Sequence, residues 1–128
     1  MSKIPQTLLA GLTIIGGLFC SQQAAPAATR SDFEQVGHFQ NGNTFHGLVF
    51  FVNAPTKRNI KELCEQKKVL FSSADLLKIH FFDNRQFTPD VTAEYYFPES
   101  SDAYLVADCF FNTSNGQEDL TFHKDIPD

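Results

Sequence analysis

Several features that mark common functional classes are missing from this sequence. No two cysteines form a CxxC pair, no histidine lies within a few residues of Cys64 or Cys109, and no serine or threonine stands in a nucleophile-elbow pattern. The loop aspartates Asp83, Asp90 and Asp102 lack the spacing of a calcium-binding loop. The sequence therefore predicts no cofactor, no metal site and no catalytic residue recognisable from a motif.

Basic residues are also scarce, with 10 Lys and Arg against 15 Asp and Glu and a net charge of −5. Nucleic acids and anionic membranes are held mainly by Lys and Arg, so this balance argues against both as partners. Five of the ten basic residues lie between Lys57 and Lys68. We interpret that cluster as the solvated face of a helix.

No apolar run in the chain reaches the ~20 residues that a membrane-spanning helix needs. The apolar run Leu8–Phe19 is shorter, follows the basic Lys3, and precedes Ala25-Pro26-Ala27, which matches the A-x-A cleavage pattern. This order predicts a signal peptide over residues 1–27 that is cleaved after Ala27. We expect a secreted or periplasmic protein without membrane insertion once the signal is removed.

Cys20 raises a different interpretation, a lipoprotein anchored through that cysteine. Lipoprotein signals require a small residue immediately before the cysteine, and here Phe19 occupies that position. The two interpretations differ in the N-terminus that they predict for the mature protein.

Cys64 and Cys109 are the two cysteines that remain after the predicted cleavage. In an exported protein such a pair predicts a disulfide, while a catalytic thiol or a metal site is the alternative. The bond would close a loop of 45 residues (109 minus 64). The chain-entropy model gives such a loop about 4 kcal/mol of stabilisation.

The hydrophobic patterns predict one α+β domain over residues 44–124, without internal repeats. One helix would pack on a mostly antiparallel sheet of four to five strands, in the order strand, helix, then four strands. The predicted segments are a polar lead-in at 28–43, strands at 45–52, 76–82, 91–97, 103–111 and 119–123, a helix from Thr56 or Lys57 to Lys68, and a frayed tail at 125–128.

Side chains alternate between the two faces of a strand, so a Cys64–Cys109 bond would fix which residues face the helix. On the helix side we expect Leu77, Ile79, Phe81, Val91, Ala93, Tyr95, Phe97, Leu105, Ala107 and Phe111. On the opposite side we expect the candidate binding residues His80, Phe82, Tyr96, Tyr104, Asp108 and His123, together with Glu94, Val106 and Phe110. His46 joins them in one of the two orientations that the strand at 45–52 leaves open, because both its faces hold apolar residues. Exposed aromatic residues favour binding, so this face should bind a partner or be covered by residues 28–43.

These observations predict a small exported binding module, monomeric, for an unknown protein or small-molecule ligand. The alternative is a small secreted hydrolase that uses His80 or His123 with Asp108 or Glu94 as acid and base. An ordinary solvated sheet face would also carry such residues. Strand order separates these hypotheses, because it decides whether the histidines meet. Asn112-Thr113-Ser114 is a glycosylation sequon, usable only in a secretory pathway that glycosylates.

Overall fold

A computed structural model of the chain describes residues 31–128. The predicted signal peptide, its cleavage after Ala27 and the possible lipidation at Cys20 lie outside the described residues. Within the described part, no helix is long and apolar enough to cross a membrane. The elements are β1 (Asp32–Asn41), β2 (Phe45–Asn53), α2 (Lys57–Leu70), β3 (Leu76–Phe82), the 3₁₀ helices η1 (Arg85–Phe87) and η2 (Glu99–Tyr104), β4 (Leu105–Asn112) and β5 (Gln117–Phe122).

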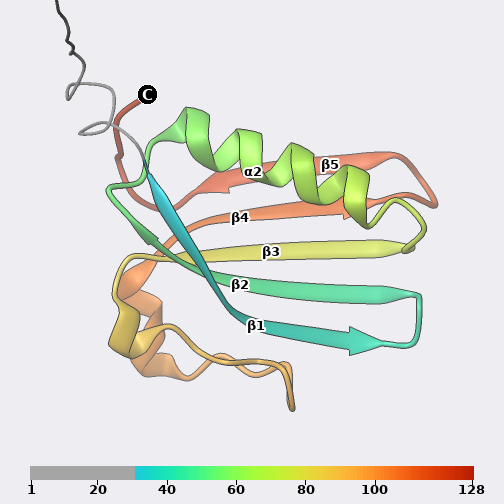
Figure 1. The fold of residues 1–128 in the computed structure, drawn as a ribbon, viewed down its shortest axis with the longest axis horizontal. Helices are drawn as coiled ribbons and strands as arrows, with labels where there is room; N and C mark the ends of the chain where they lie inside the picture. Colours follow the sequence, from blue (N-terminus) through green and yellow to red (C-terminus); the bar gives the residue numbers. More distant parts are fainter. Residues whose placement is uncertain (1–30) are drawn as a thin grey trace, which may run out of the picture. The chain divides into compact units, whose positions relative to one another are not determined.

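The five strands form one sheet in which spatial order follows chain order, β1-β2-β3-β4-β5 (Figure 1). β2 and β3 are parallel, because α2 carries the chain back across the sheet between them. The other neighbouring pairs are antiparallel. The structure thus confirms an α+β fold with one helix on a mostly antiparallel five-stranded sheet.

Two predicted segments are wrong, and each has a physical reason. The predicted lead-in contains β1, where Gly37 forms a register shift in the ladder rather than ending the element. Residues 91–97, predicted as a strand, lie in the segment between β3 and β4, and Pro89 and Pro98 bound them. Prolines cannot donate to a ladder, so this stretch covers the sheet instead of joining it.

Helix α2 begins at Thr56, whose side chain accepts a hydrogen bond from the Asn59 N–H at 3.1 Å. Ile60 and Cys64 are the buried residues of the helix. At the other end, Lys67 and Lys68 lie in the last turn, where positive charge suits the helix dipole.

The face of the sheet under α2 carries the larger core, which we call the inner face. Its buried residues are Leu48, Phe50, Val52, Ile60, Cys64, Leu77, Ile79, Phe81, Val106, Ala107, Cys109 and Phe111. The disulfide joins Cys64 on α2 to Cys109 on β4 with the Cα atoms 6.4 Å apart, so the predicted pairing is confirmed. The bond therefore fastens the helix to the sheet.

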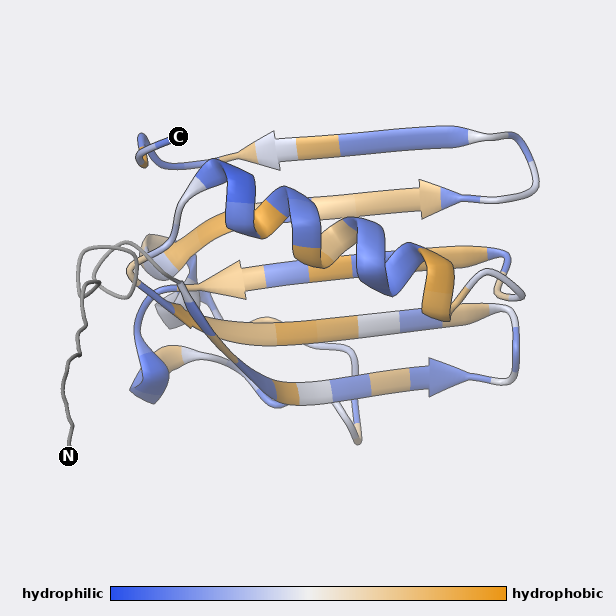
Figure 2. Cartoon of the chain, turned by 45° about the horizontal axis from the view of Figure 1, so that its top comes forward, coloured by the Kyte–Doolittle hydropathy of each residue, from blue (hydrophilic) through white to orange (hydrophobic). Residues whose placement is uncertain are grey.

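The opposite, outer face is covered in part by residues 83–104, the covering loop. Val49, Phe82 and Val91 are buried there, and Tyr95 and Phe97 of the loop pack against them. β2 is therefore buried on both faces, and Figure 2 shows how hydrophobic it is compared with β5.

Two glycines allow the covering loop to lie directly on the strands. A Cβ atom at Gly37 of β1 would stand 2.7 Å from the backbone nitrogen of Val91. At Gly47 of β2 it would stand 2.6 Å from the ring of Tyr95. Residues 28–43 were one of two alternatives for this face, but residues 32–41 lie in the sheet as β1 and the covering loop lies on the face instead.

The C-terminal tail is also held, contrary to the prediction of fraying. The Lys57 N–H donates to the Pro127 carbonyl at 2.8 Å, and Ile126 packs against the inner core. The Lys124 ammonium pairs with Asp83 at 2.8 Å. These contacts hold the tail against the start of α2 and the end of β3.

Candidate functional site

Strand alternation decides which face of the sheet each candidate residue occupies. In β3, Leu77, Ile79 and Phe81 belong to the inner core, while Phe82 belongs to the outer one. A register shift opposite Phe81 and Phe82 changes the start of β4, and so Val106 packs inward and Leu105 outward, the reverse of the prediction.

Four side chains meet on the outer face and form what we call the Asp108 cluster: Tyr95, His80, Asp108 and His123. Asp108 of β4 lies between the two histidines. Its Oδ1 lies 2.6 Å from His80 Nδ1, and its Oδ2 lies 2.7 Å from His123 Nε2. The strands of His80 and His123 are not neighbours, but the carboxylate between them joins the two rings.

Tyr95 of the covering loop completes the cluster from above, with its hydroxyl hydrogen-bonded to His80 Nε2. The ring of Phe97 contacts the His80 ring at 4.7 Å between centroids. An ionised carboxylate only accepts, so both histidines donate to Asp108. Neutral His80 then accepts the Tyr95 O–H at its other nitrogen, and the loop is fixed to the sheet.

The electrostatics of the cluster favour an ionised Asp108 and a neutral Tyr95. Burial opposes ionisation of Asp108, but the hydrogen bonds and charges of His80 and then His123 together hold its pKa below the ordinary value. Burial, and then the nearby Asp108 charge, raise the pKa of Tyr95 well above its usual value. Tyr95 is therefore a hydrogen-bonding phenol rather than a phenolate.

Solvent reaches the cluster unevenly. The side chains of His80 and Asp108 are 15% and 29% exposed, whereas that of His123 is 38% exposed. On the outer sides of β4 and β5, Phe110 is partly exposed, and Asp119 and Thr121 are exposed. His123 is therefore the member of the cluster that can reach a ligand most easily.

The remaining predicted residues do not join the cluster. Phe82 is only 2% exposed and belongs to the outer core, so it offers no binding surface. Tyr104 stacks on Phe87 at 5.0 Å, and Tyr96 is 60% exposed on the covering loop. Glu94 is exposed on the same loop. The expected open aromatic patch of Phe82, Tyr96, Tyr104 and Phe110 is not formed.

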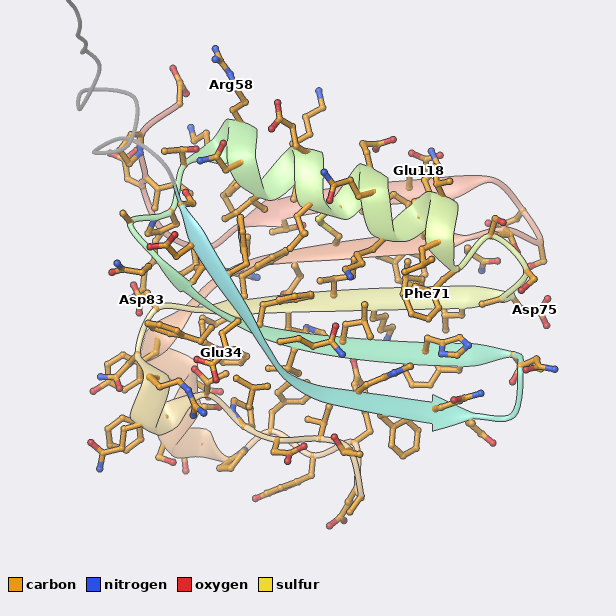
Figure 3. The ribbon with its side chains drawn as sticks, viewed as in Figure 1. Glu34, Arg58, Phe71, Asp75, Asp83 and Glu118 are labelled. Atoms are coloured by element: carbon orange, nitrogen blue, oxygen red, sulfur yellow. A yellow bond between two sulfur atoms is a disulfide. The ribbon has the colours of Figure 1, made fainter. Side chains whose placement is uncertain are left out.

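His46 lies on the inner face, in a second pair that the sequence did not predict. His38 Nε2 lies 2.8 Å from His46 Nδ1, and His46 is 9% exposed. Phe71, at the C-terminal end of α2, packs on both rings (Figure 3). Burial, and then the nearby His38, lower the pKa of His46.

Tyr95 is the functional candidate that sequence reasoning missed, because it was assigned to the helix side of a strand that does not form. The prolines at 89 and 98 were the available signal that residues 91–97 are a covering segment. That the Tyr95 hydroxyl bonds to His80 could be known only from the fold.

A groove of about 190 Å³ opens on the other side of the sheet, between α2 and β5. The disulfide, Phe111 and Leu120 provide its apolar lining, and Lys61, Glu65, Glu118 and Asp119 provide its charged lining. Figure 3 shows Glu118 beside the helix.

Comparisons with protein-family models, with curated protein sequences and with solved structures found no match to this chain. Among residues 31–128, no group of three or more His, Cys, Asp or Glu side chains is placed to hold a metal ion.

Proposed function

We propose that this protein is a small exported binding module that binds its ligand on the open part of the outer face, next to the Asp108 cluster. The disulfide suits an oxidising compartment, which agrees with export. The observation that carries the proposal is the Asp108 carboxylate held between two histidines, one of them exposed.

The residues that pair across β3, β4 and β5 next to the Asp108 cluster form the open part of the outer face. Lys78 pairs with Phe110, Phe110 with Asp119, and Asp108 with Thr121. These residues alternate with inward-facing ones, so their side chains share the outer face. The surface therefore offers an aromatic ring beside a histidine, a lysine and a carboxylate.

Fixing His123 in advance favours binding for an entropic reason. A polar side chain that is already held by a hydrogen bond loses little freedom when it contacts a ligand. Phe110, with the Lys78 ammonium 5.7 Å from its ring centroid, adds a partly exposed aromatic contact. Such mixed aromatic and polar surfaces are typical of interfaces.

The test compares binding by the natural protein with that of a His123→Ala/Phe110→Ser double variant. The tagged full-length chain is expressed in its own cells, and the exported protein is recovered with whatever it holds. Mass spectrometry then identifies co-purified proteins and small molecules. We expect the double variant to lose a partner that the natural protein retains.

An Arg58→Ser variant is the matched control, because Arg58 lies on α2, on the opposite side of the sheet (Figure 3). It should retain the partner. Equal recovery by the double variant, at an unchanged melting temperature, would refute the proposed surface.

A hydrolase is the second candidate, favoured by the order hydroxyl, imidazole, carboxylate in Tyr95, His80 and Asp108. The neutral, buried phenol is a poor nucleophile, so His123 would act as a general base on water, with Asp108 orienting its ring. Because Nε2 of His123 is bonded to Asp108, the other ring nitrogen, Nδ1, would take the proton from the attacking water.

Turnover distinguishes the two candidates. Purified protein is assayed against nitrophenyl esters and phosphates, with His123→Ala and Tyr95→Phe as variants. A hydrolase would lose a factor of roughly 10²–10⁴ in rate in His123→Ala and little in Tyr95→Phe. The binding module should show no turnover above that of the His123→Ala variant.

A further inference from the structure

The two edge strands of the sheet differ in how they are protected. β1 carries a register shift between Gln35 and Gly37, and its His38 N–H donates to the Thr92 side chain of the covering loop at 3.1 Å. Both features block further strand pairing. β5 runs from Gln117 to Phe122 in unbroken register with β4. The β5 edge is therefore the one suited to accept another strand.

Strand geometry identifies which backbone groups β5 presents. The His123 N–H donates to the Val106 carbonyl at 2.8 Å, so these residues form a hydrogen-bonded pair. Hydrogen-bonded and non-hydrogen-bonded pairs alternate along an antiparallel ladder. Glu118, Leu120 and Phe122 therefore direct their N–H and C=O groups away from β4, toward an incoming strand.

The groove between α2 and β5 lies on the side of these same residues. Leu120 and Phe111 line it together with the Cys64–Cys109 bond, and its volume is about 190 Å³. A strand paired with β5 would place the side chain opposite Leu120 beside this groove. An apolar residue of the size of valine suits that position.

The charges around this edge select the partner. Glu65, Glu118 and Asp119 line the groove with Lys61, and Lys68 pairs with Glu65 and Glu118, which leaves one net negative charge at this edge (three minus two). Lys68 already pairs with Glu118 at 2.6 Å, but Asp119 has its acidic group on the exposed outer side. A second copy of the chain would bring the same carboxylates, which disfavours self-pairing.

We propose that β5 and the adjoining groove accept an extended basic peptide, which pairs with the edge strand and places an apolar side chain beside the disulfide. Backbone hydrogen bonds would hold it, and lysines or arginines of the partner, alternating with its apolar residues, would face Asp119 on the other side of the strand. This surface shares Asp119 with the open part of the outer face but none of the four side chains of the Asp108 cluster, and the proposal does not depend on the function proposed there.

Fluorescence anisotropy with labelled synthetic peptides tests the proposal on the exported full protein. The probe is a blocked peptide that alternates valine with lysine, and its matched control alternates valine with glutamate. A third peptide has the valine–lysine sequence with N-methyl groups on alternate backbone nitrogens. We expect the first to bind, and the other two to bind at least about tenfold more weakly.

An Asp119→Lys variant sharpens the test, because Asp119 is exposed and its replacement leaves the core intact. It should weaken valine–lysine binding by about three- to tenfold and improve valine–glutamate binding. Amide chemical shifts should move in Gln117–Phe122 and not in β1.

Three results would each overturn the proposal. They are equal binding of the lysine and glutamate peptides, undiminished binding of the N-methylated peptide, and shifts confined to β1 or to the outer face. Absence of binding by all three peptides would overturn it as well.

Discussion

The two faces of the sheet are covered in different ways. A regular helix, fixed by a disulfide, covers the inner face, whereas the outer face is covered by an irregular loop held through Tyr95 and His80. Each face also contains a pair of histidines. The outer pair is joined through the Asp108 carboxylate, while the inner pair, His38 and His46, is bonded directly.

This difference has an electrostatic consequence. A carboxylate between two imidazoles compensates their charge when they take up protons. In the inner pair one neutral imidazole donates to the other, so protonating both rings would break that hydrogen bond and bring two like charges together in a site where His46 is buried. The outer pair is thus suited to exposure and function, and the inner pair to packing at neutral pH.

The largest expected effect on stability comes from removing the disulfide that fastens α2 to the inner face. Replacement of both Cys64 and Cys109 by Ala should lower the free energy of unfolding by about 4 kcal/mol, since the bond closes a loop of 45 residues. Urea denaturation measures the change. At ~4–8 °C per kcal/mol the melting temperature should fall by more than about 15 °C. A loss below about 1 kcal/mol would show that α2 is held by packing alone.

A smaller effect is expected from disturbing the outer covering. In Gly37→Ala, the added Cβ meets the Val91 backbone, which cannot move aside as a side chain would. We expect a loss of about 1–3 kcal/mol in thermal or urea denaturation, typical of overpacking. Thr121→Ala, on the open part of the same face, is the control and should change stability by less than about 0.5 kcal/mol. Equal effects of the two would mean that the loop is not packed closely on β1.

The smallest effect is a dependence of stability on pH at the inner pair. The pKa of His46 in the folded state is lowered below 6.5, so the unfolded chain takes up a proton first as the pH falls. Stability is therefore complete above about pH 6.5 and declines below it, by on the order of 1 kcal/mol between pH 7.5 and 5.5. Lys67, one helical turn before Phe71, adds positive charge on the same side of the sheet.

The control is a His38→Gln/His46→Gln double variant, which keeps His80 and His123. Its urea-denaturation stability should vary less over this pH range than that of the natural protein. The lowered pKa of Asp108 acts in a separate window, since its contribution is lost only as the pH falls below about 4. If the stability of the variant depended on pH as that of the natural protein does, His38 and His46 would not be the source of the pH dependence.

Much of the inner face followed from the sequence, because one covalent contact fixes strand parity. Once Cys109 was assigned to the helix, the directions of Asp108, Phe110 and Phe111 followed from alternation. The reversed positions of Leu105 and Val106 did not, because an irregularity in the ladder adds a residue without any distinct sequence signal.

The outer face could be predicted only in part. His80, Asp108 and His123 were assigned to it correctly, but their meeting depended on β4 lying between β3 and β5. β1 was missed because its polar and turn-forming residues resemble a loop, and its pairing with β2 is decided by tertiary packing. Tyr95 was misplaced with the strand that does not form.

The disulfide also determines how the molecule would respond to a mechanical force. Residues 64 and 109 enclose β3 and the whole covering loop in a covalent ring. A pull on the two ends of the chain can extend β1, β2 and β5, but the force bypasses the ring through the bond between the sulfur atoms. About 150 Å of potential extension, 45 residues at ~3.3–3.6 Å each, is thereby withheld until the bond is reduced.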